Sequence, residues 1–338
     1  KPDDELVLRP GIIIKFTPPG YGTFLIYGVL QTQGTATNPV VFTSLSDDVY
    51  GGDTNGDGDA TSGQPGDWSG IRLMEGSEGI LDHFIGHYGG NYYYYYYPST
   101  AVVVERGGTN IVSASSADLT LTHSQIAYSA LNGIGASGTV LISHSNFHEN
   151  GATGLSATSS INGAVLITAT EAISNGGNGI GVDASGTGQV ANCLTRSNSS
   201  NGIRISASGI ITVLNNIVEG NGGAGISLNA SGNITPTIVG NIANDNGTYP
   251  LMLRAGTYRI MLTEEHFHDN QGTGNGVQGV WITGAFAGTL IPQSDLVYVT
   301  DNIGDIRSGG STNYRGSLTV KPDDELVLRP GIIIKFTP

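Results

Sequence analysis

Short apolar runs alternate with polar turns along the middle of the chain, and the pattern recurs at a nearly constant interval. Between residues 117 and 256, a Gly or Pro directly precedes an apolar residue every 21 to 25 residues. The positions are Gly133-Ile134, Gly154-Leu155, Gly179-Ile180, Gly202-Ile203, Gly225-Ile226 and Pro250-Leu251. A repeat of about 20 to 25 residues without a helical segment is typical of a solenoid, in which each turn covers the next. The pattern therefore predicts an all-β coil of short strands.

Polar residues recur at equivalent turn positions of these repeats. Asparagine tolerates left-handed backbone conformations, and its amide can bond to the asparagine one turn away. We therefore predict structural ladders of Asn150, Asn175, Asn198, Asn221, Asn246 and Asn270. His123 and His144 also fall in register one coil apart, and we predict a stacked surface pair rather than a metal site. Cys193 stands at an inward-type position and is predicted to be an inert core residue.

The repeat from Asn216-Ile217 to Gly225-Ile226 resembles the right-handed parallel β-helix repeat of the pectate-lyase-like superfamily. Residues 192–203 and 241–251 follow it more loosely. The flanks resemble a narrower family of bacterial surface β-helix proteins, in the run 318–336, the segment 38–44 and the acidic loop that leads into 66–71. The resemblance implies a right-handed parallel β-helix (solenoid) of about 12 coils with loop excursions, roughly 55–60 Å long.

The first eighteen residues, Lys1 to Pro18, reappear unchanged as Lys321 to Pro338. Packing requires only the apolar positions to recur, so the return of the charged residues points to a copied gene segment. We expect a single β-helix over 1–338, with 1–320 as one tandem repeat unit and 321–338 as the start of the next. The alternative is an end duplicated by design. The predicted repeat junction comprises Leu318, Val320, Leu326, Leu328, Ile332, Ile334 and Phe336.

The charge balance narrows the range of partners. Charged residues make up only 12% of the chain, and 28 acidic against 14 basic residues give a net charge of −14. That balance disfavours nucleic acid and anionic membranes as partners and is compatible with cation binding. The single cysteine excludes an internal disulfide framework. No apolar run approaches the roughly 18 residues that a membrane span needs, so no membrane insertion is expected.

One acidic loop carries the clearest chemical motif. Oxygen side chains stand at alternate positions from Asp53 to Asp59, and glycines between them let the loop curl. A hard cation with 6–8 oxygen ligands requires this arrangement, so we predict a structural Ca²⁺ site. An EF-hand is not expected, because Gln64 replaces the bidentate Glu and no helices flank the loop. The predicted ligands are Asp53, Asn55, Asp57 and Asp59, completed by Asp47, Asp48 and Asp67.

A run of six tyrosines follows Gly89-Gly90-Asn91. In an extended strand three of them would face each way, so a narrow coil cannot bury them all. They form either an aromatic contact surface for a neighbouring rod or for sugar rings, or a strand with one face in the core. The residues are Tyr92, Tyr93, Tyr94, Tyr95, Tyr96 and Tyr97.

A catalytic site is harder to assemble from these residues. Relatives with this fold include polysaccharide lyases and glycoside hydrolases, but a Ca²⁺-assisted lyase needs a basic residue beside the metal. All four lysines lie in the duplicated segment, away in sequence from the acidic loop, and Arg204 is the best basic candidate on the coil face. A hydrolase needs two carboxylates about 5–10 Å apart, and neither Asp183 nor Glu219 has an evident partner. We do not expect an enzyme.

Three functions remain open. The favoured hypothesis is a structural repeat of a long extracellular or cell-surface fibre, stalk or adhesin, whose partner is itself through end-to-end homotypic stacking. The alternatives are a carbohydrate-binding surface module, which would use the tyrosine run and Trp281, and a polysaccharide lyase or hydrolase. Duplicated ends suit both a covalent array of units and separate subunits that join end to end, and we favour the covalent array.

Overall fold

The computed structural model describes residues 4–19, 22–90, 92–93, 107–108, 112–114, 116–301 and 318–337. All regular elements among these residues are β-strands, and nearly all of their pairings are parallel. The described residues therefore include no helix that could span a bilayer. The chain divides into two compact units, unit 1 (Lys1–Ala157 and Thr170–Gly177) and unit 2 (Thr158–Ala169 and Asn178–Pro338).

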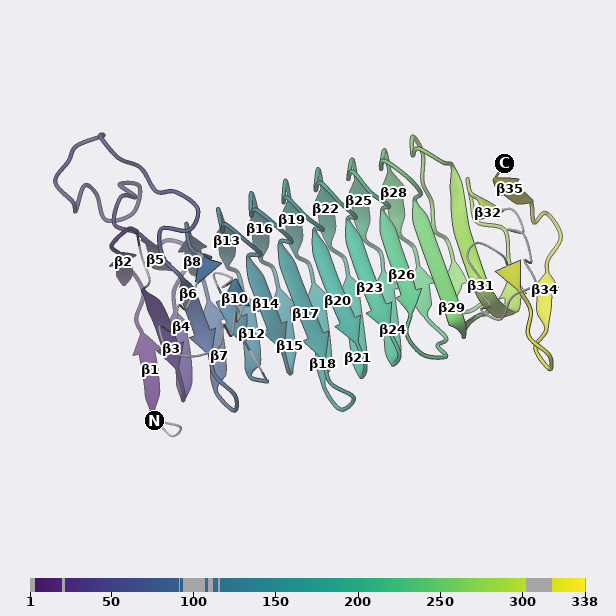
Figure 1. Ribbon diagram of the computed structural model, residues 1–338, viewed down its shortest axis with the longest axis horizontal. Helices are drawn as coiled ribbons and strands as arrows, with labels where there is room; N and C mark the ends of the chain where they lie inside the picture. Colours follow the sequence, from purple (N-terminus) through teal and green to yellow (C-terminus); the bar gives the residue numbers. More distant parts are fainter. Residues whose placement is uncertain are drawn as a thin grey trace, which may run out of the picture. The chain divides into compact units, whose positions relative to one another are not determined.

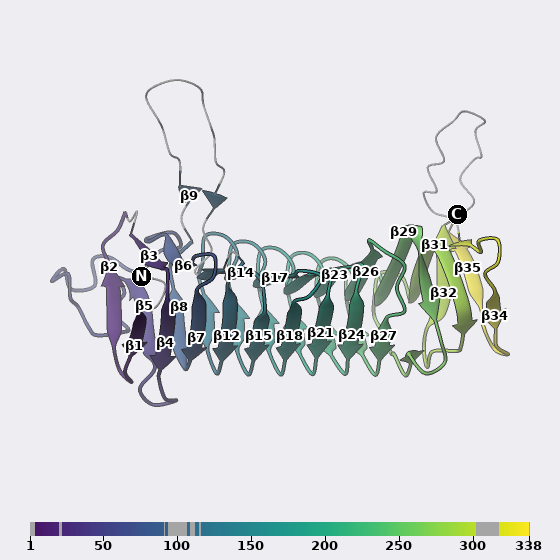
Figure 2. The same ribbon diagram turned by 90° about the horizontal axis from the view of Figure 1, so that it is seen from below.

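Unit 1 is a coil with three parallel sheets, one strand of each sheet per turn. The sheet orders are β1-β4-β7-β12-β15, β2-β5-β8-β13-β16-β19 and β3-β6-β11-β14 (Figure 2). A short antiparallel pair, β9 with β10, lies outside these sheets. The strands are β1 (Glu5–Leu8), β2 (Ile13–Phe16), β3 (Thr23–Ile26), β4 (Val29–Gln33), β5 (Val40–Ser44), β6 (Gly70–Leu73), β7 (Glu78–Asp82), β8 (Phe84–His87), β9 (Tyr92–Tyr93), β10 (Gly107–Gly108), β11 (Val112–Ala114), β12 (Asp118–Thr122), β13 (Gln125–Ala127), β14 (Ile134–Ser137), β15 (Val140–Ser143), β16 (Asn146–His148) and β19 (Glu171–Ile173).

Unit 2 repeats this plan, and β17 (Leu155–Ser159) straddles the division between the units. Its sheet orders are β18-β21-β24-β27-β30, β22-β25-β28 and β20-β23-β26-β29-β31-β32-β35 (Figure 1). The strands are β18 (Ala164–Thr168), β20 (Ile180–Ala184), β21 (Thr187–Ala191), β22 (Leu194–Arg196), β23 (Ile203–Ala207), β24 (Ile210–Leu214), β25 (Ile217–Glu219), β26 (Ile226–Ala230), β27 (Thr237–Val239), β28 (Ile242–Asn244), β29 (Leu251–Leu262), β30 (Phe267–His268), β31 (Gly279–Leu290), β32 (Val297–Asp301), β33 (Leu318–Thr319), β34 (Leu326–Leu328) and β35 (Ile334–Thr337).

The all-β parallel β-helix expected from the sequence is thus confirmed. The first-named sheet of each unit contains five strands, one per turn, so the described residues form about ten turns rather than the expected 12. The core follows from the alternation of side chains along each strand. In β4 and β12, for example, inward residues such as Leu30, Leu119 and Leu121 are fully buried while their neighbours are not. Cys193 is buried as predicted.

Two series of corners join the strands, and each corner residue has a left-handed backbone. The first corner series follows β7, β12 and β15 in unit 1 and β18, β21, β24, β27 and β30 in unit 2. Its residues, with φ between 47° and 67°, are His83, His123, His144, Ala169, Asn192, Asn215, Gly240 and Asp269. The second corner series follows β8, β13, β16 and β19 in unit 1 and β22, β25 and β28 in unit 2. Its residues are Tyr88, Tyr128, Glu149, Ser174, Ser197, Gly220 and Asp245.

Buried asparagine ladders connect successive turns within each unit, as the sequence predicted. In unit 1, Asn150 Nδ2 donates to Asn175 Oδ1 at 2.9 Å. In unit 2, one ladder runs through Asn198, Asn221, Asn246 and Asn275. The assignment of Asn270 to this series was wrong. Asn270 belongs to a second ladder of Asn216, Asn241, Asn270 and Gln293, because extra residues between Leu253 in β29 and Phe267 in β30 lengthen that turn.

Candidate metal centre and repeat junction

The acidic loop between β5 and β6 curls around the side chain of Asp53. Asp53 Oδ1 accepts hydrogen bonds from the backbone N–H groups of Gly56 (2.7 Å) and Asp57 (3.1 Å), and Oδ2 accepts one from Gly58 (2.9 Å). Gly56 and Gly58 have φ of 74° and 64°, a backbone that glycine adopts without strain. The N–H of Gly58, together with those of Gly56 and Asp57, lowers the pKa of Asp53. The loop therefore holds this carboxylate ionised.

Three of the predicted ligands meet in this loop. One carboxylate oxygen from each of Asp48, Asp53 and Asp57 lies within 4.8 Å of the other two. Three acceptor oxygens there, Asp48 Oδ1, Asn55 Oδ1 and Asp57 Oδ1, are buried without a hydrogen-bond partner. Burial, and then the charges of Asp53 and Asp57, raise the pKa of Asp48. Convergent oxygens that lack donors fit a hard cation such as Ca²⁺.

The remaining predicted ligands lie elsewhere. Asp47 is buried and accepts hydrogen bonds from Thr43 Oγ1 and from the N–H of Val49. Asp67 accepts from Ser44 Oγ at 2.6 Å and from the N–H of Gln64 at 2.9 Å. These two carboxylates fasten the base of the loop to the end of β5. Asp59 is exposed and is not part of the three-carboxylate group.

Lys15 contradicts the expectation that the lysines lie away from this loop. Its Nζ donates to the carbonyl of Gly52 and to Thr54 Oγ1, both at 2.7 Å. The contact joins the first copy of the duplicated segment to the acidic loop, because β2 pairs with β5, the strand that leads into the loop. A separation of about 40 residues hid this contact from sequence reasoning.

The two ion pairs on the coil face also correct the sequence analysis, which found no partner for Asp183 or Glu219. Arg204 Nη1 lies 3.2 Å from Asp183 Oδ1. Arg196 Nη2 lies 2.9 Å from Glu219 Oε2. Each pair joins neighbouring parallel strands, so Arg204 already forms an ion pair with the adjacent turn.

Of the tyrosine run, Tyr92 and Tyr93 form β9, and Tyr94, Tyr95, Tyr96 and Tyr97 lie outside the described residues.

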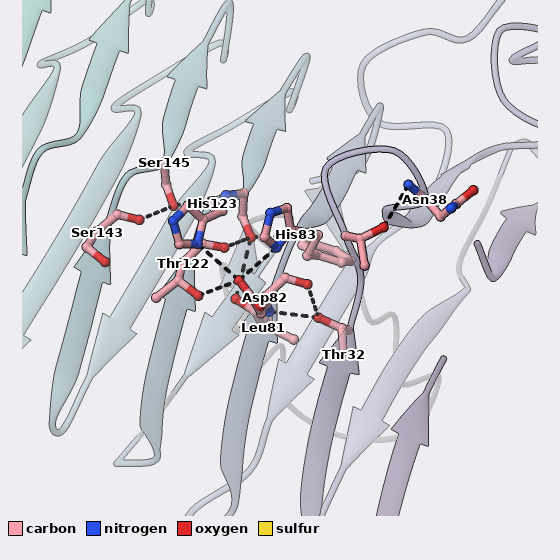
Figure 3. A network of polar contacts seen from close by, with 12 residues as sticks. Thr32, Asn38, Leu81, Asp82, His83, Thr122, His123, Ser143 and Ser145 are labelled. Atoms are coloured by element: carbon pink, nitrogen blue, oxygen red, sulfur yellow. Dashed lines mark hydrogen bonds and ion pairs between the residues drawn. The ribbon is translucent and has the colours of Figure 1, made fainter. Parts of the chain in front are cut away.

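Histidine rings stack along the first corner series of unit 1 (Figure 3). The centroids of His83 and His123 are 4.8 Å apart, and those of His123 and His144 are 5.1 Å apart, with nearly parallel planes. The predicted pairing of His123 with His144 is thus confirmed. Sequence reasoning missed His83, because the inserted segment after β8 lengthens that turn to 40 residues.

The carboxylate of Asp82 contacts two rings of this stack. Asp82 Oδ1 lies 3.0 Å from His83 Nδ1, 3.2 Å from His123 Nδ1 and 2.8 Å from Thr122 Oγ1 (Figure 3). Burial acts to raise the pKa of Asp82, but the hydrogen bonds from Thr122, His123 and His83 outweigh it and lower the pKa. The two ring nitrogens lie near the same oxygen, and the three ligand atoms, all within 4.8 Å of one another, could also hold a metal ion.

Aromatic rings line the second corner series of unit 1. Tyr88 and Tyr128 stack with centroids 5.2 Å apart, and His87 meets Tyr50 and Tyr128 edge-on. Burial, followed by the charge of His148, lowers the pKa of His87 to about 4. Burial also raises the pKa of Tyr88 to about 12. These groups are therefore neutral near pH 7.

The two copies of the duplicated segment occupy different sheet edges. In the first copy, β1 pairs with β4 and β2 pairs with β5 in unit 1. In the last copy, β34 pairs with β31 and β35 pairs with β32 in unit 2 (Figure 1). Of the predicted junction residues, Leu318 lies in β33, Leu326 and Leu328 in β34, Ile334 and Phe336 in β35, and Val320 and Ile332 in adjoining turns.

The first copy bonds through one set of backbone groups. The carbonyl of Asp4 accepts from the N–H of Val29 at 3.0 Å. The carbonyl of Ile12 accepts from the N–H of Val41 at 2.9 Å. In a parallel sheet, successive residues of one strand direct these groups to opposite edges. The neighbouring residues of the first copy, Glu5 and Ile13, therefore direct theirs away from unit 1's next turn.

The last copy bonds through the backbone groups of the alternate residues, which point to the opposite edge of the strand. The carbonyl of Glu325, the counterpart of Glu5, accepts from the N–H of Gly288 at 2.7 Å. The carbonyl of Ile333, the counterpart of Ile13, accepts from the N–H of Tyr298 at 2.9 Å. The same peptide thus uses complementary backbone groups at its two locations. One copy has the groups to pair on both edges at once.

One comparison with known protein families agrees with the fold over part of the chain. The model of the family described as "Right handed beta helix region" matches residues 97–241. No curated protein matches the chain. Two solved structures resemble it, both at 14% sequence identity. A mutant of a periplasmic alginate epimerase aligns over 98% of this chain and 77% of its own, with a TM-score of 0.45. The A-module of a mannuronan C-5 epimerase from Azotobacter vinelandii aligns over 97% of this chain and 91% of its own, with a TM-score of 0.33.

Proposed function

We propose that this chain is a structural repeat of an extracellular fibre, stalk or adhesin that continues end to end as a calcium-stabilised β-solenoid. The observation that carries the proposal is the complementary use of the duplicated segment. Asp4 and Ile12 bond to the turn that follows the first copy, while Glu325 and Ile333 bond to the turn that precedes the last copy. A segment placed between two repeats satisfies both turns and leaves no unpaired edge there.

Exposed apolar side chains in both copies of the duplicated segment support the same proposal. In the first copy, Leu6 and Ile13 are each 40% exposed, and in the last copy Leu328 and Phe336 are 50% and 59% exposed. A further turn of coil on either copy would cover such residues, and burial stabilises by about 25 cal/mol per Å². Both copies therefore carry the surface expected of a strand that belongs inside a continuous coil.

A chain with two consecutive repeats tests the proposal. Residues 1–320 are followed directly by residues 1–338, and the product is examined by small-angle scattering and electron microscopy. We expect one straight rod about twice as long as the single chain, because each added turn contributes about 4.8 Å. Two rods joined by a variable angle would contradict the proposal. Native filaments with an axial repeat near one unit would support it in the source cells.

The calcium part of the proposal rests on the carboxylates of Asp48, Asp53 and Asp57 and on the buried acceptor oxygen of Asn55. Bound Ca²⁺ would give these oxygens a positive partner in direct contact, which Lys15 is not, because its Nζ donates to Gly52 and Thr54 instead. The site's role would be to fix the long excursion between β5 and β6 on unit 1.

Calcium titration of three variants tests this site. We expect Ca²⁺ to raise the melting temperature of the wild-type chain, and Asp57→Asn to abolish most of that rise. Asp48→Asn should weaken it as well. Asp59→Asn is the matched control, because it removes an exposed charge from the same loop outside the cluster.

Ca²⁺ binding should also weaken as the pH falls through the raised pKa of Asp48, because only the ionised carboxylate binds the ion. Equal loss in all three variants would mean general charge attraction and no site.

A further inference from the structure

The last copy of the duplicated segment is held on unit 2 by specific side chains as well as by strand pairing. Asp324 Oδ1 lies 2.6 Å from Arg259 Nη1, and the Asp324 side chain is only 10% exposed. Arg329 Nε contacts Glu264 Oε1. Lys321 Nζ donates to the carbonyl of Thr257 at 2.8 Å. Together with β31 and β32, the residues Thr257, Arg259 and Glu264 form what we call the segment-docking surface.

The segment-docking surface pairs with two charges of the segment, an aspartate first and an arginine second. An arginine on unit 2 receives an aspartate of the segment, and a glutamate on unit 2 receives an arginine five positions later. Between these contacts β34 pairs with the end of β31, in the register Gly288 with Leu326 and Leu290 with Leu328. Two opposite ion pairs that flank a strand fix both its direction and its register. These contacts favour this sequence over a strand without the two charges.

The first copy contains the same charged residues. Asp4 and Arg9 are the counterparts of Asp324 and Arg329, because residues 1–18 and 321–338 are identical. In unit 1 Arg9 contacts the amide oxygen of Gln33 at 3.1 Å, an exposed contact without an opposite charge. An ion pair with a glutamate is stronger than this contact. Arg9 thus has a better partner on the segment-docking surface than on its own unit.

Docking of a first copy onto this surface does not require it to leave its own unit. The first copy bonds to β4 and β5 through Asp4 and Ile12, whereas the segment on unit 2 bonds through Glu325 and Ile333, the counterparts of Glu5 and Ile13. The two sets therefore use backbone groups on opposite edges of the strand. The occupant only has to displace the last copy, which has the same sequence and makes the same contacts.

We propose that residues 1–18 of a second copy of this chain bind the segment-docking surface in exchange for the chain's own residues 321–338. This inference rests on the proposed end-to-end function and names its contact. Separate chains then join as tandem repeats do, and the exchange is close to neutral at the docked contacts. The incoming strand keeps the pairing with its own unit, so one segment is then paired on both edges.

Peptide binding to the full chain tests the exchange. The probe is a fluorescent peptide with the sequence of residues 1–18. In the wild-type chain the tethered last copy competes at a high effective concentration, so binding should be weak. In the double variant Asp324→Arg with Arg329→Glu, the last copy loses both ion pairs. The peptide should bind this variant at least tenfold more tightly than the wild type, by fluorescence anisotropy.

Charge reversal supplies the controls. A peptide with Asp4→Arg and Arg9→Glu should bind the double variant at least tenfold more weakly than the unchanged peptide. A chain with Arg259→Glu and Glu264→Arg should reverse this preference, which keeps the test valid if the first variant folds poorly. Hydrogen exchange of β34 and β35 reports release of the last copy in each chain.

Two outcomes would overturn the exchange: release of the last copy without peptide binding, or equal binding of both peptides. If the two-repeat chain is still one straight rod, the proposed function stands and only the exchange fails. If that chain is jointed while the peptide binds with the expected charge preference, the docking surface stands and the continuous solenoid fails.

Discussion

The corners of unit 1 and unit 2 have the same backbone and different side chains. In unit 2 the left-handed positions carry small or compact polar residues, such as Asn192, Asn215 and Asp245. In unit 1 most of the equivalent positions carry rings, among them His123 and Tyr128, and the exceptions are Glu149 and Ser174. A left-handed backbone costs a residue other than glycine about 1–2 kcal/mol, and Asn and Asp tolerate it best. The coil therefore sets the corner conformation, and the side chains adapt to it.

Contacts between turns offset that cost in unit 1. Each ring stacks on the ring one turn away, and an aromatic pair contributes about 0.5–1.5 kcal/mol beyond its burial. Asp82 adds hydrogen bonds to two of the histidines. Unit 2 has two buried asparagine ladders that connect its turns from inside, and unit 1 has the shorter ladder of Asn150 and Asn175. The comparison shows that the same coil can add stacked rings on its corners to interior hydrogen bonds between turns.

The largest effect is expected from breaking a ladder in unit 2. Asn241 Nδ2 donates to Val213 O at 3.0 Å and to Asn270 Oδ1 at 2.9 Å, and its own oxygen accepts from Asn216. Asn241→Ala leaves several buried polar groups without partners, each worth about 1–3 kcal/mol. We expect a loss of roughly 3–5 kcal/mol in the free energy of unfolding, measured by denaturant titration.

The matched variant in unit 1 removes the hydroxyl of Ser145, which bonds to the neighbouring turn. Ser145 Oγ accepts from the N–H of Ser124 at 3.2 Å and donates to Ser143 O at 2.8 Å. Ser145→Ala removes fewer bonds and should cost about 1–2 kcal/mol. Equal losses from Asn241→Ala and Ser145→Ala would show that the interior ladders do not distinguish the two units.

Sequence periodicity predicted the fold because every turn repeats the same packing problem. The spacing from Gly133 to Pro250 identified the strands, and buried asparagines at equal intervals identified most of one ladder. The second ladder was missed because Asn216 and Asn241 stand within a few residues of the first-ladder asparagines. The spacing alone did not separate the two series at Asn270.

The candidate site was predictable only in part, since local spacing does not show which loop residues meet. The alternating oxygens correctly grouped Asp53 with Asp57, but Asp47 and Asp67 looked equivalent to Asp48 in sequence. Their different roles arise from Thr43 and Ser44 at the end of β5, whose hydroxyls turn these two carboxylates away. Insertions that lengthen a turn likewise hid the contact of Lys15 with the loop and of His83 with His123.

An intermediate effect is expected from acid on the rings of unit 1. Burial, with the nearby charge of His148, lowers the pKa of His87 from 6.5 to about 4. The folded state therefore keeps His87 neutral while the unfolded chain takes up a proton below pH 6.5. Stability should fall between pH 6.5 and 4 by roughly 3 kcal/mol in total. Unfolding free energies measured across this range by denaturant titration check the slope.

His87→Phe keeps a ring at this position and removes the titrating group, so it should flatten the slope. His144→Asn alters an exposed histidine of the same unit and should leave the slope unchanged. A slope that survives His87→Phe would assign the acid sensitivity to another group, such as His148, whose pKa burial also lowers.

The smallest effect is expected from exchanging corner residues between the units. His123→Asn places the unit 2 type of residue on a unit 1 corner with φ of 49°. Better tolerance of the left-handed backbone should offset much of the lost stacking, so the unfolding free energy at pH 7 should change by less than about 1 kcal/mol.

In the same variant, His123→Asn, Asp82 loses one hydrogen-bond donor, so its lowered pKa should rise toward the ordinary value. The stability that the ionised Asp82 contributes, which is lost as the pH falls through its folded pKa, should then disappear at a higher pH. Carboxyl NMR of Asp82 measures this shift, and His123→Val, which strains the same corner, is the control and should cost about 2 kcal/mol. If His123→Asn proved as costly as His123→Val, the rings rather than the backbone would determine the corners of unit 1.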